Sequence, residues 1–275
     1  MWLKLSVILV SFLSFQTQSF GTEIPEVEIG VDAWYNRLNI QSKYLTQWEK
    51  SAYHNLDIAT DFKFPDSALL GRFLKIRYKN LSLCYQYYSP GIDFLEIFLP
   101  SPIGSDGYRK LDNTVIHDVE SYFSAHNVLI QYKTMDYFDL ALISSRFKDS
   151  ISLHGGPDGC YVEDQKYGTL RPRFKAEMLG FGMVNHIEIT EETISLATEA
   201  FYLPLTSIEC FYDIAKSDKL VLKGKSISAS AKLLFRAKNY LFDVGYRYNS
   251  SISNNKLFEA KMHGVVFGIH YTGFQ

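Results

Sequence analysis

The last stretch of the chain, "HGVVFGIHYTGFQ" at positions 263–275, alternates strictly between two kinds of residue. One set is large and apolar, namely Val265, Phe267, Ile269 and Tyr271. The other set is mostly small or polar, namely Val266, Gly268, His270 and Thr272. A period of two is typical of a β-strand with one apolar face. Because the sequence ends on this strand, the question is whether that face meets a protein core or lipid.

The same alternation runs through most of the chain. It recurs in "VEIGVDAWY" (27–35), "TISLATEAFY" (193–202), "ECFYDI" (209–214), "SISASAKLLF" (226–235) and "YLFDVGYRY" (240–248). Between these segments, turn-forming residues divide the chain into ten expected strands. Their ranges are 26–38, 54–64, 72–88, 115–134, 137–148, 188–202, 207–217, 225–237, 240–249 and 261–273. The segment 173–189 is an alternative strand pair, which would raise the number of strands to twelve.

The composition excludes some classes of function. The 275 residues are 47% hydrophobic and 15% aromatic, yet the mean hydropathy is only −0.09, so the apolar residues are dispersed along the chain. The net charge of −2 offers no basic excess to neutralise phosphates, which argues against a nucleic-acid partner. Abundant Phe and Tyr suit broad sheets or a membrane interface.

The N-terminus has the features of a secretory signal peptide. Lys4 precedes an apolar run from Leu5 to Phe15, and Ser19 and Gly21 are spaced as signal peptidase prefers. A membrane anchor is the alternative, but the run is too short to cross about 30 Å of hydrocarbon. We therefore expect a signal peptide at 1–21 and a single β-domain at 22–275.

Short and long links alternate along the expected strands. The short links begin at Pro65, Met135, Leu203 and Lys238, and the long links begin at Asn39, Ser89, Asp149, Ser217 and Asn249. This asymmetry is typical of an outer-membrane barrel with tight periplasmic turns and longer outer loops. The prediction is an all-β, up-and-down antiparallel transmembrane β-barrel of about ten strands, with both termini periplasmic.

A closed barrel answers the question raised by the last strand. Its apolar face would meet lipid, and the strand would pair with the first, since an open edge in hydrocarbon leaves backbone groups unsatisfied. We expect one set of side chains on the lipid face: Phe235, Phe242, Val244, Tyr246, Phe267 and Ile269. We expect Lys232, Asp243, Arg247 and His270 inward or at an interface. Phe274 is out of phase with Tyr271, which departs from the usual closing pattern.

The chain resembles a family of proteobacterial outer-membrane β-barrel proteins of about 250 residues whose function is unassigned. The resemblance rests on "EVEIGVDAWYNRL" (26–38), "DFKFPDSALLGRFLKIRYKNLS" (61–82), "VLIQYKTMDYFDLALISSRF" (128–147), "AFYLPLTSIEC" (200–210), "LFDVGYRYNS" (241–250) and "GVVFGIHYTGF" (264–274). These are structural motifs, and the resemblance implies no catalytic residues. The single proline at Pro65 and the overhanging Phe274 and Gln275 depart from the family pattern.

Charged residues on the polar faces allow two interpretations of the barrel interior. The residues are Asp32, Lys75, Arg77, Glu199, Glu209, Lys232, Asp243 and Arg247. They could line a lumen that conducts small solutes, or they could form an internal network that plugs the barrel. The second interpretation is favoured, because eight strands are just filled by their own side chains and open channels need about sixteen.

No motif predicts an enzyme, a cofactor site or a metal site. The segment 246–255 is similar to part of a lipid A deacylase, but Asn249 stands where a His base is needed. "HGGPDG" (154–159) is foremost a turn sequence, and the acidic clusters "ITEET" (189–193) and "HDVES" (117–121) are too poor in carboxylates for a calcium loop. The three cysteines Cys84, Cys160 and Cys210 allow one disulfide or buried or lipid-facing thiols.

These observations predict an integral outer-membrane protein without catalysis. It would serve envelope integrity or surface contact, with a possible ligand at the loops 89–114 and 149–172. A barrel that transports small solutes or hydrophobic molecules is the second hypothesis, and a lipid-modifying barrel enzyme or a soluble periplasmic β-protein are the others. The expected partners are outer-membrane lipid, lipopolysaccharide and, during biogenesis, the barrel-assembly machinery of a Gram-negative bacterium.

Overall fold

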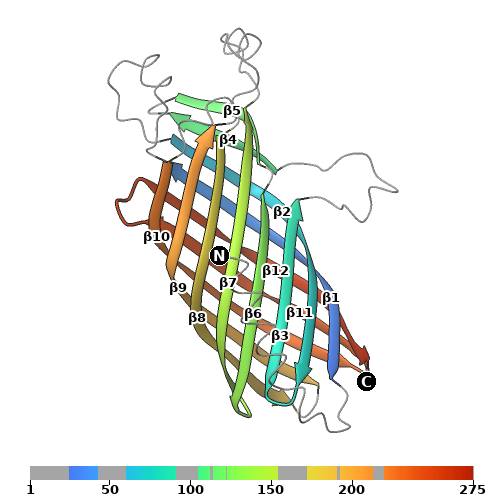
Figure 1. The fold of residues 1–275 in the computed structure, drawn as a ribbon. Coiled ribbons are helices and arrows are strands. Elements are labelled where there is room, and N and C mark those ends of the chain that lie inside the picture. Colours follow the sequence, from blue (N-terminus) through green and yellow to red (C-terminus); the bar gives the residue numbers. More distant parts are fainter. Residues whose placement is uncertain are drawn as a thin grey trace.

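The computed structural model describes residues 25–42, 60–90, 105–111, 114–121, 123–153, 172–190, 193–212 and 220–274, and these form twelve strands (Figure 1). The strands are β1 (Glu26–Ser42), β2 (Thr60–Tyr78), β3 (Leu81–Pro90), β4 (Ser105–Leu111), β5 (Thr114–Ser121), β6 (Ser124–Met135), β7 (Phe138–Leu153), β8 (Pro172–Thr190), β9 (Ile194–Tyr212), β10 (Leu220–Ala237), β11 (Tyr240–Ser253) and β12 (Phe258–Phe274). Among these residues there is no helix with the length and apolar character of a membrane span. The expected signal peptide, 1–21, lies outside the described residues.

Ten of the strands form a closed antiparallel barrel. The order around the wall is β1-β2-β3-β6-β7-β8-β9-β10-β11-β12, and β12 pairs back with β1 (Figure 1). The remaining strands, β4 and β5, form a hairpin that extends one end of the wall, where β4 pairs with the start of β2 and β5 with the end of β7. The prediction of an up-and-down barrel of about ten strands is confirmed.

Two of the predicted turns are wrong. The expected link at Pro65 lies within β2, and the expected link at Leu203 lies within β9. Both segments contain a proline, and at both the register is irregular, so the proline lies at a β-bulge. A bulge leaves a residue out of the ladder, and a proline there removes no inter-strand hydrogen bond.

The predicted number of ten strands is nevertheless correct, because the two false turns are balanced by two turns that were not predicted. One joins β2 to β3 at Lys79 and Asn80, inside the expected strand 72–88. The other follows β8, most of which was held only as an alternative. The expected strand 115–134 is divided between β5 and β6.

Short and long links alternate as predicted, but four long links begin later than expected, because Asn39, Ser89, Asp149 and Asn249 lie inside β1, β3, β7 and β11. The link expected from Asn249 is only the four residues between β11 and β12. The turn between β10 and β11 uses the same dipeptide as that between β2 and β3, and Lys79 and Lys238 have similar positive φ angles of 53° and 54°. We call the end of the barrel with these turns, the start of β1 and the end of β12 the turn end. The opposite end, where the segments 43–59, 91–104, 154–171 and 213–219 attach, is the loop end.

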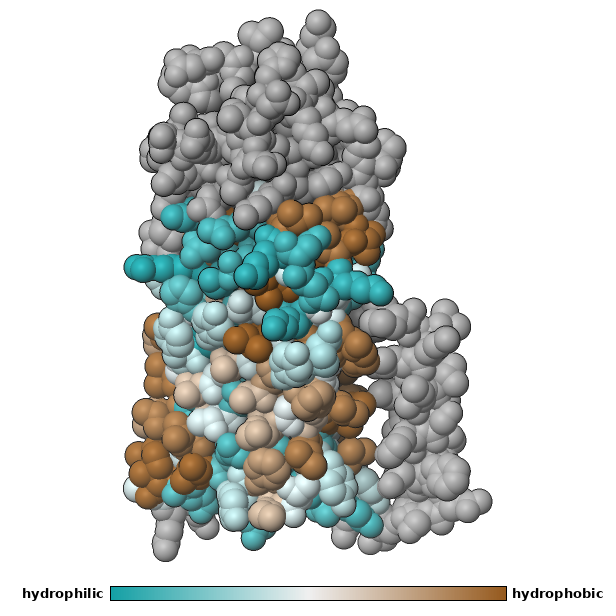
Figure 2. All heavy atoms as spheres, turned by 90° about the vertical axis from the view of Figure 1, so that its left-hand side faces the viewer, coloured by the Kyte–Doolittle hydropathy of each residue, from teal (hydrophilic) through white to brown (hydrophobic). Residues whose placement is uncertain are grey.

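The two faces of the wall differ as the alternation predicted. Phe235, Phe242, Tyr246, Phe267 and Ile269 are exposed on the outer surface, whereas Asp243, Arg247 and His270 are buried inside. Figure 2 shows apolar side chains on the flank of the barrel below a hydrophilic band. The predicted lipid face and interior are therefore confirmed for these residues.

The bulge at Pro204 reverses part of the predicted pattern on β9. Before the bulge the buried positions are Ala197, Phe201 and Leu203, and after it they are Thr206, Ile208 and Cys210. Glu209 therefore lies on the outer surface, where its carboxylate is 3.7 Å from Lys175, and its assignment to the polar interior face is wrong. Cys84 and Cys210 are both buried free thiols, and Cys160 lies outside the described residues.

The barrel closes with one irregularity. Along most of its length β12 pairs with β1 in continuous register, for example Tyr35 with Val265. Near the turn end Ile29 pairs with Tyr271 and Val27 with Phe274, so β12 uses one residue more than β1. The phase break seen in the sequence before Phe274 corresponds to this shift of register.

Candidate functional site

Charged side chains meet inside the barrel near the turn end. Asp32 comes from β1, Lys232 from β10, Asp243 from β11 and His270 from β12, and these strands are neighbours in the wall. The side chains of Asp32, Asp243 and His270 are each less than 5% exposed. We call these four residues together with Glu28 the charged cluster.

His270 joins the carboxylates of the charged cluster. Its Nδ1 lies 2.9 Å from Glu28 Oε1, and its Nε2 lies 3.1 Å from Asp32 Oδ1 and 3.0 Å from Asp243 Oδ2. A carboxylate only accepts hydrogen bonds, and a neutral imidazole has a single N–H. Because both ring nitrogens face carboxylates, the geometry fits an imidazolium that donates from each nitrogen.

Lys232 supplies a second positive charge. Its Nζ lies 3.1 Å from Asp243 Oδ1 and 4.0 Å from Asp32 Oδ1. Within the described residues, ligand atoms of Asp32, Asp243 and His270 all lie within 4.8 Å of one another, close enough to hold a metal ion. The ammonium already provides the positive charge that these carboxylates require, so the arrangement is that of an internal ion-pair network.

Arg247 and Tyr88 extend this network toward the middle of the barrel. The Tyr88 hydroxyl donates to Asp32 Oδ2 at 2.9 Å and accepts from Arg247 Nη1 at 2.7 Å. The guanidinium also lies 3.8 Å from Glu199 Oε2 and 5.6 Å from the centroid of the Trp34 ring. Hydrogen bonds and a cation–π contact therefore hold this arginine in one position.

Two glycines make room for these side chains. A Cβ on Gly268 would clash with the carboxylates of Asp243 and Asp32, and a Cβ on Gly71 would clash with the Tyr88 ring. The interior at this height is therefore filled by the charged and aromatic groups themselves. A larger residue at either glycine would displace the network.

The loop-end half of the lumen is mostly apolar and contains a cavity of about 60 Å³. A space of this size holds a few water-sized groups. Apolar side chains form most of its lining: Trp34, Leu38, Ile40, Phe123, Ala125, Leu129, Ile143, Phe147, Met178, Phe201, Leu203, Ala260 and Met262. Arg247 and Tyr88 line it as well, so the cavity borders directly on the network described above.

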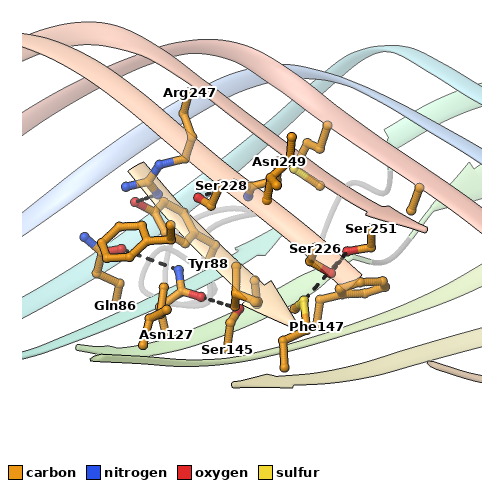
Figure 3. A pocket seen from close by; sticks show the side chains of 18 of the residues that line it. Gln86, Tyr88, Asn127, Ser145, Phe147, Ser226, Ser228, Arg247, Asn249 and Ser251 are labelled. Atoms are coloured by element: carbon orange, nitrogen blue, oxygen red, sulfur yellow. Dashed lines mark hydrogen bonds between the residues drawn. The ribbon is translucent and has the colours of Figure 1, made fainter. Parts of the chain in front are cut away.

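Two rows of polar side chains cross the apolar lining (Figure 3). In one row Ser145 Oγ donates to Asn127 Oδ1 at 2.6 Å, and the Asn127 amide lies 3.5 Å from Gln86 Oε1. The other row, on β10 and β11, pairs Ser228 with Asn249 at 2.6 Å and Ser226 with Ser251 at 2.8 Å. The side chains of each row are hydrogen-bonded to one another. They also provide a few polar groups for a bound ligand in an otherwise apolar space.

The structure brings together five of the eight charged residues predicted for the interior. Asp32, Glu199, Lys232, Asp243 and Arg247 belong to one network. Of the other three, Lys75 lies beside the network, opposite Glu28 in the pairing of β1 with β2. Arg77 forms a half-exposed ion pair with Glu26, and Glu209 faces outward.

Other members of the network and the cavity were missed in the sequence. Trp34 has the same parity as Asp32 in "VEIGVDAWY", so the alternation alone contained the signal for its burial. Tyr88 had no such signal, because the missed turn at Lys79 left the faces of its strand unassigned.

The comparisons with known proteins find similarity in structure only. No protein-family model and no characterised protein sequence matches the chain. Among solved structures, the outer membrane protease OmpT from Escherichia coli is similar with a TM-score of 0.56, 11% sequence identity, and 94% of this chain and 99% of that chain covered. Ail from Yersinia pestis has a TM-score of 0.32 at 11% identity (90% and 99% covered), and the toluene transporter TodX from Pseudomonas putida has 0.32 at 10% identity (94% and 70%).

The similarity to a protease corrects one expectation. The sequence predicted a protein that is not an enzyme. This prediction is contradicted, because OmpT, whose barrel is similar to that of this chain, is an enzyme. At 11% identity the likeness shows the fold alone, so it assigns no catalytic residue to this chain. The chain has the closed antiparallel β-barrel fold of bacterial outer-membrane proteins.

Proposed function

We propose that this outer-membrane barrel binds a small, mostly apolar molecule in the loop-end half of its lumen. The observation that carries the proposal is the cavity of about 60 Å³, enclosed by apolar side chains and bordered by the ion-pair network. Ligand sites are typically concave and apolar, with a few placed polar groups that orient the ligand. The two polar rows beside aromatic walls fit that description.

Binding is favoured over free passage by the turn-end half of the lumen. The charged cluster lies between the cavity and the turn end, and its carboxylates, ammonium and imidazole contact one another directly. A solute that left through this end would have to separate buried ion pairs, which costs several kcal/mol. We therefore propose a lumen that is open to ligand from the loop end and closed at the turn end.

The size of the cavity and its aromatic lining favour a compact ligand with a short alkyl chain. Trp34, Phe123, Phe147 and Phe201 present rings to the cavity, and a short alkyl chain would make dispersion contacts with them. A single hydroxyl or amide on the ligand would find a partner in the row Gln86, Asn127 and Ser145. Short aliphatic alcohols are the chemical class that matches both features.

Quenching of Trp34 fluorescence by 2-bromoethanol, a molecule small enough for the cavity, tests the proposal. The purified barrel in detergent would carry Trp48→Phe, so that Trp34 is the tryptophan reporter within the domain 22–275. We expect saturable quenching, because a bound bromine would lie beside the Trp34 ring. The substitution Ala125→Phe fills the cavity and should abolish the saturable component.

A matched substitution on the outer wall separates lumen binding from partition into detergent. Ala231 is exposed on the lipid face of β10, so Ala231→Phe adds the same group outside the cavity. It should leave saturable quenching unchanged. Linear quenching of equal slope in all three proteins would contradict a lumen site.

The orientation of the barrel is part of the proposal. We propose export by the signal peptide 1–21, the loop end at the cell surface and the turn end in the periplasm. An epitope tag near Gly156 should then be reached by antibody on intact cells, whereas a tag inserted after Lys238 should be reached only after the envelope is broken. The reverse pattern would invert the barrel.

The loops 89–114 and 149–172 remain a predicted contact surface. Only their edges lie among the described residues, at Ser89 and Pro90, in β4 and the start of β5, and where β7 ends and β8 begins. A role in envelope integrity or surface contact would be compatible with a lumen site, since the proposed ligand would pass these loops to reach it.

A further inference from the structure

A group of cations lies on the outer surface of β7 to β10 near the loop end. We call it the cationic patch. It consists of Arg146, Lys148, Lys175, Lys223 and Lys225, and it includes two acids, Glu177 and Glu209. With five cations and two acids, the patch carries excess positive charge.

The two acids are already used by Arg146 and Lys175. Glu177 Oε1 lies 3.6 Å from Arg146 Nε and 3.1 Å from Lys175 Nζ, and Glu209 Oε2 lies 3.7 Å from Lys175 Nζ. Lys148 is directly opposite Lys175 in the pairing of β7 with β8. Like charges directly opposite one another are destabilising, so this position favours an added anion.

Lys223 and Lys225 form the second part of the patch. Both are exposed on the same face of β10, two residues apart, and they have no acidic partner within the described part of the chain. The wall separates β10 from β8 by one strand, which is roughly 10 Å at ordinary strand spacing. The patch therefore presents two cationic groups about one disaccharide apart.

The patch lies immediately on the loop side of the apolar belt. The exposed apolar residues next to the patch on its turn side are Leu142, Phe181, Leu205 and Ile227. Figure 2 shows the corresponding hydrophilic band directly above apolar side chains. Side chains at this level meet the headgroup region of the leaflet rather than its hydrocarbon.

The turn end is arranged differently. There Arg77 is paired with Glu26 at 3.6 Å, and Lys133 with Asp136 at 3.1 Å. Each of these two cations belongs to a separate pair of strands and has its own acid. The other turn-end lysines, Lys79 and Lys238, lie in the turns of two separate hairpins. Excess positive charge on adjacent strands is thus a feature of the cationic patch, and it indicates an anionic partner in that leaflet.

We propose that the cationic patch binds the two phosphate groups of a phosphorylated disaccharide glycolipid, the lipid A part of lipopolysaccharide. Lys148 and Lys175 would contact one phosphate, and Lys223 and Lys225 the other. The acyl chains would lie against Phe181, Leu205 and Ile227 below. The proposal depends on the outer-membrane location but is independent of the lumen site.

Native mass spectrometry of the purified barrel in detergent tests this proposal. The probes are bisphosphoryl lipid A, monophosphoryl lipid A, dephosphorylated lipid A and phosphatidylglycerol. We expect the bisphosphoryl form to bind most tightly, and the triple variant Lys148→Gln, Lys223→Gln, Lys225→Gln to bind it at least about tenfold more weakly. The matched control Lys79→Gln, Lys238→Gln at the turn end should bind it as the unchanged protein does.

Three results would overturn the proposal. Equal binding of dephosphorylated lipid A would show that the protein does not recognise the phosphate groups. Equal binding of phosphatidylglycerol would show that the protein does not prefer the bisphosphorylated disaccharide to other anionic lipids. Unchanged binding by the triple variant, folded as judged by heat-dependent gel mobility, would move the site away from the patch. None of these results bears on quenching of Trp34, so the lumen proposal is tested separately.

Discussion

The two halves of the lumen are filled by different chemistry. Near the turn end, Asp32, Asp243 and His270 are buried and paired with one another and with Lys232. Near the loop end, the lining is mainly Leu, Ile, Phe and Met and leaves a cavity. Arg247 and Tyr88 lie where the two halves meet and contact both.

The difference shows how a narrow barrel can be closed at one end and receptive at the other. A network of paired charges tolerates little change, because each group depends on its partners for the free energy lost with its hydration. An apolar lining loses only dispersion contacts and transfer free energy when its shape changes. We therefore expect the turn-end half to be the rigid part of the lumen and the loop-end half the adaptable part.

The largest effect is expected from removing one charge of the cluster. Asp243→Leu removes the carboxylate that contacts both Lys232 and His270, so the buried ammonium loses its nearest acid, and it should lower the free energy of unfolding by about 3–5 kcal/mol. Urea unfolding of the barrel in lipid vesicles measures the change. The double variant Lys232→Met, Asp243→Leu should recover most of the loss, and a loss as large as in the single variant would mean that the two charges are not coupled.

A charge on the outer wall next to the cluster should have a smaller effect. Val244 follows Asp243 on β11 and pairs with Leu233 and Phe267, which are exposed on the lipid face. Val244→Arg should cost about 2–4 kcal/mol, because the guanidinium would enter hydrocarbon. Val244→Leu serves as the control in the same unfolding assay. Normal insertion of the arginine variant would show that this face does not meet lipid.

A change of shape in the apolar half should cost less again. Met262 lines the cavity and is buried, and Met262→Leu should lower the free energy of unfolding by less than about 1.5 kcal/mol. The near-isosteric Asp243→Asn in the charged half should cost clearly more under the same conditions. If the two substitutions were equally costly, the halves of the lumen would not differ in tolerance.

The smallest effect is expected in ion conduction. Because the charged cluster closes the turn end, the barrel in a planar bilayer should show no discrete conductance steps. Steady steps from the unchanged protein would mean that water and ions pass the network. That result would show that the lumen is not closed at the turn end, and it would favour a lumen that conducts small solutes.

The sequence predicted the barrel better than it predicted the strand ends. The three C-terminal strands β10 to β12 were assigned nearly completely, because a clear period of two and the Lys238–Asn239 turn define them, whereas β9 was predicted as two strands joined by a turn at Leu203. The same Lys-Asn pair at Lys79 was overlooked, since Pro65 offered a stronger turn signal nearby. A proline is compatible with a strand when a bulge removes its nitrogen from the ladder, and the existence of that bulge depends on the neighbouring strand.

The alternation of residue types and of short and long links by itself determined that this is a β-barrel. It also determined which side chains face outward, except beyond the bulge of β9, and that Asp32, Lys232, Asp243 and Arg247 point inward. Those features follow from the period of two, which is local. Only the closed wall decided which inward residues meet, because β1 and β12 are neighbours in space although they lie at opposite ends of the chain. The contact of His270 with Glu28, the cavity above the network and the opposition of Lys148 to Lys175 depend on strand register, and register is set by bulges and turns acting between strands.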